Sequence, residues 1–126
     1  ARRDPIILND LAWTLQRKGQ LEEAEKIIRE AVKLNDKLSL TWDSLGVILM
    51  KKGELKEAEK AINQSLSIVQ EEPSVFLHLA QVYLMQGKKA EARKIVPMLI
   101  RKKQQLSFQG QRELNDLAVK LGIKMD

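Results

Sequence analysis

The chain has 126 residues, 44% of them hydrophobic and 31% charged, and these values predict one soluble folded domain over residues 1–126. Its lack of cysteine excludes disulfides and thiolate metal sites and fits either the cytoplasm or a bacterial envelope, and no apolar run is long enough to span a membrane. The net charge of +5 does not indicate nucleic-acid binding, because acids and bases alternate, as in residues 56–60.

Residues 1–5 contain neither an initiator methionine nor the apolar stretch of a signal peptide, so we expect the chain to be a piece of a longer protein. From there the sequence repeats with a period of 34 residues. Residues 18–26 align with residues 52–60, and a third copy occupies residues 86–94. A fixed period of this length indicates a repeat protein in which each repeat is one structural unit. The predicted repeats are residues 5–38, 39–72 and 73–106.

Each repeat predicts a first helix that ends at a glycine. In the first repeat the apolar residues have the i, i+3, i+4, i+7 spacing of one helix face, and this spacing recurs in the other two. Gly19, Gly53 and Gly87 follow, and glycine readily adopts the left-handed conformation that ends a helix. The three apolar sets are Leu8, Leu11, Ala12 and Leu15, then Trp42, Leu45, Gly46 and Leu49, then Phe76, Leu79, Ala80 and Tyr83.

A second helix is predicted after each glycine, with the same spacing of apolar residues. Small residues of the two helices, such as Ala12 and Ala24, would let the pair approach closely. Basic pairs such as Arg17-Lys18 and Lys51-Lys52 stand at the turn, where cations complement the helix C-terminal dipole. The second-helix sets are Ala24, Ile27, Ile28 and Ala31, then Ala58, Ala61, Ile62 and Ser65, then Ala92, Ile95, Val96 and Leu99.

This order of residues in a 34-residue helical hairpin resembles the tetratricopeptide repeat family, over residues 5 to about 104. The resemblance implies an all-α, right-handed superhelical solenoid of antiparallel helix hairpins, with about seven helices. The family's proline at the repeat junction is missing, and Asp36 and Gln70 stand there instead. Residues 8–13 are also similar to repeats near the end of long bacterial arrays, which implies a bacterial source.

The tail predicts a capping helix over residues 107–122. Residues 114–118 repeat residues 8–12 letter for letter at a distance of 106, which is three periods plus four. We therefore expect a degenerate fourth first-helix, displaced by a four-residue insertion that lengthens the preceding helix by about one turn. Pro97 lies inside that preceding helix, so its packing should differ from that of the other repeats. The capping residues would be Leu114, Leu117, Ala118 and Leu121.

No group of residues predicts catalysis, a cofactor or a metal site. His78 is the single histidine, so histidine clusters that bind a metal cannot form. Glu22, Glu23 and Glu25 stand at a helix start, where acids stabilise the dipole. There is no glycine-rich phosphate loop. We expect that the chain is not an enzyme.

The expected ligand site is a face of the three first helices that is separate from the face carrying the apolar sets listed above, which we expect in the core. Counted from Pro5, Ser39 and Pro73, positions 2, 5, 9, 12 and 13 cluster there, and in the family similar positions line a concave inner groove. Some family members grip a C-terminal carboxylate with Lys, Asn and Arg side chains, but only Asn9 matches that clamp partially. The expected ligand-binding residues are Ile6, Asn9, Trp13, Gln16, Arg17, Leu40, Asp43, Val47, Met50, Lys51, Leu77, Gln81, Leu84 and Met85.

The sequence therefore predicts a protein–protein interaction module whose inner face takes an apolar peptide or helix of a partner protein. Two alternatives remain. The chain could be a structural module that forms homo-oligomers through the same face or through its uncapped N-terminal end, or it could be a regulatory segment of a larger enzyme. We expect no nucleic-acid partner and no membrane insertion.

Overall fold

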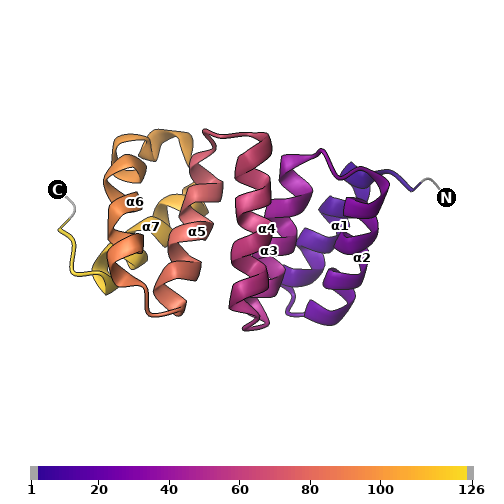
Figure 1. The fold of residues 1–126 in the computed structure, drawn as a ribbon, viewed down its shortest axis with the longest axis horizontal. Coiled ribbons are helices and arrows are strands. Elements are labelled where there is room, and N and C mark those ends of the chain that lie inside the picture. Colours follow the sequence, from indigo (N-terminus) through magenta and orange to yellow (C-terminus); the bar gives the residue numbers. More distant parts are fainter. Residues whose placement is uncertain (1–2, 125–126) are drawn as a thin grey trace. The chain divides into compact units, whose positions relative to one another are not determined.

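The computed structural model describes residues 3–124, and the ends of the predicted domain, residues 1–2 and 125–126, lie outside the described residues. The described chain forms seven α-helices and one short 3-10 helix, and contains no strand (Figure 1). The predicted all-α class with about seven helices is confirmed. In chain order the elements are α1 Pro5–Arg17, α2 Leu21–Leu34, α3 Ser39–Lys51, α4 Leu55–Ile68, α5 Pro73–Met85, α6 Lys89–Arg101, the 3-10 helix η1 Lys103–Gln105, and α7 Phe108–Lys120.

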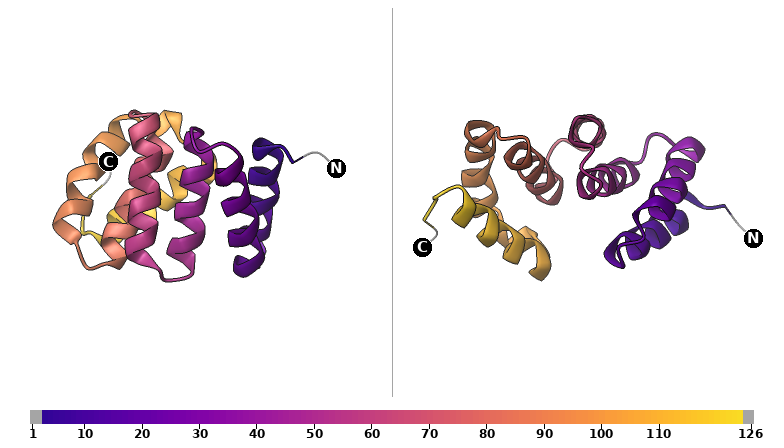
Figure 2. Two further views of the ribbon diagram at one scale, coloured as in Figure 1. Left: turned by 45° about the vertical axis from the view of Figure 1, so that its right-hand side comes forward. Right: turned by 90° about the horizontal axis from the view of Figure 1, so that it is seen from below.

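The helices divide into two compact units, the first ending at Gln70 and the second beginning at Glu71. In the first unit α1 pairs with α2 and α3 pairs with α4, and α3 also contacts both α1 and α2. In the second unit α5 pairs with α6, and α7 packs against both, as the views in Figure 2 show.

Glycine ends each first helix, as the sequence predicts. Gly19, Gly53 and Gly87 have φ angles of 81°, 82° and 80°, in the left-handed region. After α1 this conformation lets the backbone N–H of Gln20 donate to the carbonyl of Leu15 at 2.9 Å, which satisfies a carbonyl that the helix leaves unpaired.

Small residues lie where the helices of each hairpin meet, which confirms the predicted packing. Ala12 and Ala24 in the first hairpin are fully buried. In the second, Gly46 packs against Ala58 and Ile62. In the third, Ala80 and Ala92 are fully buried. Short side chains at these points allow the backbones to approach closely.

α7 covers one side of the α5–α6 hairpin. Ser107 begins the helix, and its Oγ accepts a hydrogen bond from the backbone N–H of Gly110 at 3.0 Å. Leu114, Leu117 and Leu121 are at most 3% exposed and form one apolar core with residues of α5 and α6. Each large apolar side chain buried contributes about 1.5–3 kcal/mol, so these leucines hold α7 against α5 and α6.

The prediction that an insertion lengthens the helix before α7 is wrong. α6 runs through Pro97 but ends at Arg101, and the following residues form η1. Ser107 caps α7 103 residues after Asp4 caps α1, one more than three periods of 34. The repeated pentapeptide therefore starts about one turn later in α7 than in α1. The displacement of the last helix was inferred from five identical residues, whereas the start of the helix is determined by its N-cap residue.

Trp42 was expected in the core and is only half-buried. Its indole Nε1–H donates to the backbone carbonyl of Asp36 at 2.8 Å. This hydrogen bond links the side chain to the turn between α2 and α3, as the polar N–H of tryptophan commonly finds a partner.

Candidate functional site

The predicted ligand-binding residues of the first unit lie on α1 and α3, two helices that contact each other. Ile6 and Leu40 occupy the same register position on the two helices, and each is 42% exposed. Arg17 and Lys51, at the other ends of these helices, are also exposed. The face is thus apolar at one end of the helix pair and basic at the other.

The remaining predicted residues of the first unit are covered to different degrees. Asn9, Trp13 and Asp43 are half-buried. Gln16, Val47 and Met50 are buried, with 3%, 4% and 8% of their surface exposed. A helical projection gives the angle of a side chain about its own helix, and it does not say where neighbouring helices stand. The exposed and half-buried members are the ones that a ligand can reach directly.

Two side chains on this face of α1 have a buried oxygen without a hydrogen bond. These are Oδ1 of Asn9 and Oε1 of Gln16, and no described residue donates to either. The two residues are seven positions apart, so they lie on the same side of the helix, two turns from each other. A buried acceptor without a donor costs about 1–3 kcal/mol. Both oxygens are closed to solvent, so they are not themselves contact points for a ligand.

In the second unit, α7 covers part of the predicted ligand face of α5. Leu77 is 1% exposed and belongs to the same core as the leucines of α7. The amide of Gln81 donates from Nε2 to Oε1 of Glu113 at 2.9 Å, and Gln109 donates to Oε2 of Glu113 at 3.1 Å. Leu84 is half-buried and Met85 is 53% exposed. Sequence reasoning missed Gln109 and Glu113, because the tail was considered only as a cap.

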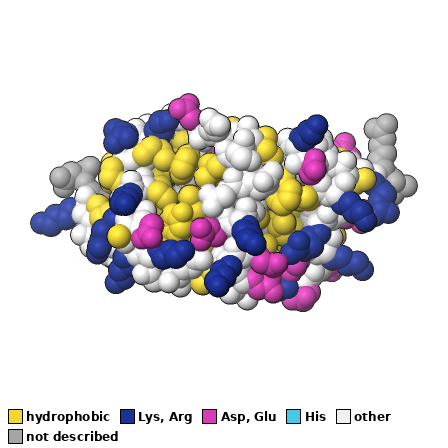
Figure 3. Space-filling view, in the orientation of Figure 1, with side chains coloured by type: hydrophobic (Ala, Val, Ile, Leu, Met, Phe, Trp, Pro, Cys, Tyr) yellow, Lys and Arg dark blue, Asp and Glu magenta, His cyan; other side chains and the backbone are white. Residues whose placement is uncertain are grey.

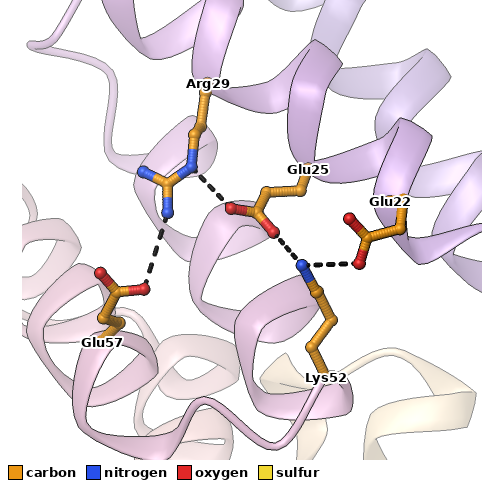
Figure 4. Close-up of polar contacts among 5 residues, drawn as sticks. All are labelled: Glu22, Glu25, Arg29, Lys52 and Glu57. Atoms are coloured by element: carbon orange, nitrogen blue, oxygen red, sulfur yellow. Dashed lines mark hydrogen bonds and ion pairs between the residues drawn. The ribbon is translucent and has the colours of Figure 1, made fainter.

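Charged residues join the two hairpins of the first unit. Figure 4 shows the Lys52 ammonium between the carboxylates of Glu22 and Glu25, at 2.8 Å and 2.5 Å. Arg29 contacts the other oxygen of Glu25 at 2.8 Å and reaches Glu57 at 3.8 Å. The helix-start carboxylates thus bind cations of their own unit, and Lys52, at the end of α3, links the hairpins.

These contacts shift two pKa values. The hydrogen bond from Lys52, together with Arg29, lowers the pKa of Glu25 from its ordinary value of 4.5, against the opposing effect of burial. The hydrogen bonds to Glu22 and Glu25 raise the pKa of Lys52 above its ordinary value of 10.5. Both shifts favour the charged forms, so the network is ionised at neutral pH. The sequence contained a signal for this ion pair, because Lys52 and Glu25 both belong to the repeated segment.

The surface carries mixed charge. On the face drawn in Figure 3, Lys and Arg side chains lie among Asp and Glu, and hydrophobic side chains are visible over α5 and α6. Within the described residues, no group of three or more His, Asp or Glu side chains could hold a metal ion. None of the helices in residues 3–124 is long and apolar enough to cross a membrane.

Two family models, each described as tetratricopeptide repeat, match the first unit at residues 7–37 and 41–69. These matches coincide with the two hairpins whose glycine turns and small packing residues are described above. The chain belongs to the tetratricopeptide repeat family. A comparison with curated proteins gave no match to this repeat protein.

Solved structures of other tetratricopeptide repeat proteins have the same fold. The type III secretion translocator chaperone SycD of Yersinia enterocolitica, in an alternative dimer, has a TM-score of 0.77 at 21% identity, covering 95% of this chain and 96% of that one. SycD in complex with a peptide of the translocator YopD has a TM-score of 0.71 at 22% identity, covering 90% and 91%. The first such domain of Spaghetti (RPAP3), bound to the HSP90 peptide SRMEEVD, has a TM-score of 0.78 at 13% identity, covering 94% and 96%. At these identities the likeness shows the fold alone.

Proposed function

We propose that this repeat protein is a protein–protein interaction module that binds an apolar segment of a partner protein, and that it performs no catalysis. The observation that carries the proposal is the pair Ile6 and Leu40, exposed at one register position on two helices in contact. Half-buried Trp13 lies on the same face of α1. Exposed apolar side chains gathered on one face are typical of protein interaction sites.

The structures of SycD with a YopD peptide and of the RPAP3 domain with an HSP90 peptide show that other proteins of this fold bind peptides. The carboxylate clamp of some family members is not proposed here, because its positions other than that of Asn9 are occupied by Trp13, Ser44, Ser74 and His78.

The test is selection of peptides from a displayed random library on the immobilised chain, followed by titration calorimetry with the recovered peptides. Leu40→Glu should weaken their binding by about tenfold or more, because a carboxylate must then lose water in an apolar contact. Leu34→Glu is the matched control, since Leu34 is 47% exposed but lies on α2, away from the proposed face. Equal affinities for both variants, or no recovered peptide, would reject the proposal.

Self-association is a second candidate. One structure of SycD is an alternative dimer. Leu11 was expected in the core but is 47% exposed, and Ile7, one turn before it on α1, is 57% exposed. If a second copy covers them, the mass measured by light scattering should rise with concentration, and Leu11→Glu should abolish the rise. A constant monomer mass would exclude this candidate.

A further inference from the structure

One stripe of residues on α1 is exposed, although the residues at the same repeat positions on α3 are covered. The stripe follows the spacing i, i+4, i+7, i+11, which places its members on one side of the helix. Its two apolar members are 57% and 47% exposed, and its two polar members are exposed as well. The exposed stripe consists of Ile7, Leu11, Thr14 and Lys18.

The counterparts of the stripe on α3 lie one period of 34 residues later. Thr41, Leu45 and Ile48 are at most 3% exposed, and the side chain of Lys52 is 16% exposed. α1 and α3 each pair with the second helix of their own hairpin, but α3 also contacts both helices of the hairpin before it. We attribute the burial of the α3 stripe to this preceding hairpin. The stripe of α1 is thus a helix-packing surface that no helix within residues 3–124 covers.

The charged end of the stripe indicates what a matching helix would carry. Lys52 binds Glu22 at 2.8 Å and Glu25 at 2.5 Å, and these two acids stand three positions apart at the start of α2 (Figure 4). Lys18 has the repeat position of Lys52, but no carboxylate within residues 3–124 forms an ion pair with it. A helix that packs on α1 as α2 packs on α3 would therefore bring two acids to Lys18.

A second copy of this chain does not offer such a helix. The two acids of α2 already bind Lys52. At the repeat position of Glu22, α4 carries Lys56 and α6 carries Ala90. Alanine would give Lys18 no partner at that position, and a lysine would repel it. The charges therefore favour a helix of another protein over a second helix of this one.

We propose that the stripe docks an amphipathic helix of a partner protein, with two acidic residues three positions apart at its start and apolar residues along the facing side. The acids bind Lys18, and the apolar residues cover Ile7 and Leu11, as exposed apolar side chains on one face commonly mark an interaction site. This inference goes beyond the proposed function, because the stripe lies on a different side of α1 from Trp13 of the proposed ligand face.

The probe is a peptide of residues 20–35, which contains the two acids of α2, held helical by a hydrocarbon staple between positions 26 and 33. Lys26 and Lys33 are exposed in α2, so the staple avoids the packing side. When the peptide is added to the isotopically labelled full chain, the backbone amide signals of Ile7 and Lys18 should shift in NMR spectra. Shifts confined to other helices, or no shifts, would overturn the proposal.

Charge reversal tests the preference for acids. Lys18→Glu should weaken binding of the stapled peptide by about tenfold in titration calorimetry. A peptide with Glu22→Lys and Glu25→Lys should show the opposite order, binding Lys18→Glu better than the wild type. Lys60→Glu is the matched control, because it makes the same change of charge at an exposed position of α4, and circular dichroism melting checks that each variant is folded. Equal weakening by Lys18→Glu and Lys60→Glu would show long-range attraction alone and overturn the role of Lys18.

Light scattering of the chain without peptide separates a partner helix from a second copy. The proposal expects a constant monomer mass. A mass that rises with concentration in the wild type and stays constant in Leu11→Glu would assign the stripe to a second copy and overturn the proposal. The ligand face at Leu40 is tested separately by the displayed library, so failure at the stripe leaves the proposed function standing.

Discussion

Gly46 lies so close to Ile62 that a Cβ atom at Gly46 would be 2.4 Å from Cγ1 of Ile62 and 3.3 Å from the backbone oxygen of Ala58. The second hairpin therefore depends on a missing side chain at the point where its two helices cross. The equivalent positions of the other hairpins carry Ala12 and Ala80, which are fully buried.

We expect Gly46→Ala to lower the free energy of unfolding by about 1–3 kcal/mol, measured by urea denaturation. Alanine is the better helix former by about 1 kcal/mol, but overlap with a branch near the backbone outweighs that gain. Gly46→Ala combined with Ile62→Ala should cost less than the sum of the two single losses, because alanine lacks the Cγ1 atom that the new Cβ would meet. Strictly additive effects of the two substitutions would show that the residues do not compete for space.

The packing of α7 gives a second prediction. Leu114→Ala should lower the free energy of unfolding by about 2–5 kcal/mol, since Leu114 is fully buried and the substitution leaves a cavity against α5 and α6. Val119→Ala on the same helix should change it by less than about 0.5 kcal/mol, because Val119 is 77% exposed. Similar denaturation midpoints for the two variants would contradict the orientation of α7.

The charged network of the first unit predicts a dependence of stability on acid. The pKa of Glu25 is lower in the folded chain than its ordinary 4.5, so its contribution to stability is complete above that value and disappears as the pH falls through the folded pKa. The raised pKa of Lys52 acts oppositely, and its contribution disappears only on raising the pH above 10.5. Between these limits the contribution is constant.

Urea denaturation at about pH 7 and about pH 3.5 should show that Glu25→Gln is less stable than the wild type at neutral pH and that the difference narrows in acid. Glu23→Gln serves as the control, because Glu23 is exposed on the same helix and outside the network of Figure 4. A gap between Glu25→Gln and the wild type that stays constant with pH would show that the carboxylate charge is not what stabilises the contact.

The features that recur in every hairpin were predicted from the sequence. The 34-residue period, the glycine turns and the small residues such as Gly46 each reflect one local requirement that recurs in every hairpin. The contact of α7 with Leu77 and Gln81 could not be predicted, because the repeat register does not say which tail residue, such as Glu113, packs against α5. The link between Lys52 and Glu25 was also missed, although both residues belong to the repeated segment, because it joins residues 27 positions apart in two different hairpins.

The two tryptophans of the first unit should separate stability from binding. Trp42 is half-buried and its indole N–H donates to the Asp36 carbonyl, so Trp42→Ala should lower the free energy of unfolding by about 3 kcal/mol, the low end for loss of a buried aromatic. Trp13 lies on the proposed ligand face, so Trp13→Ala should reduce the free energy of binding of a selected peptide by about 2 kcal/mol. The loss in the free energy of unfolding should be smaller. Denaturation gives the first quantity and titration calorimetry the second. Peptide binding that is unchanged in folded Trp13→Ala would remove this aromatic residue from the site and leave Ile6 and Leu40 without their expected anchor.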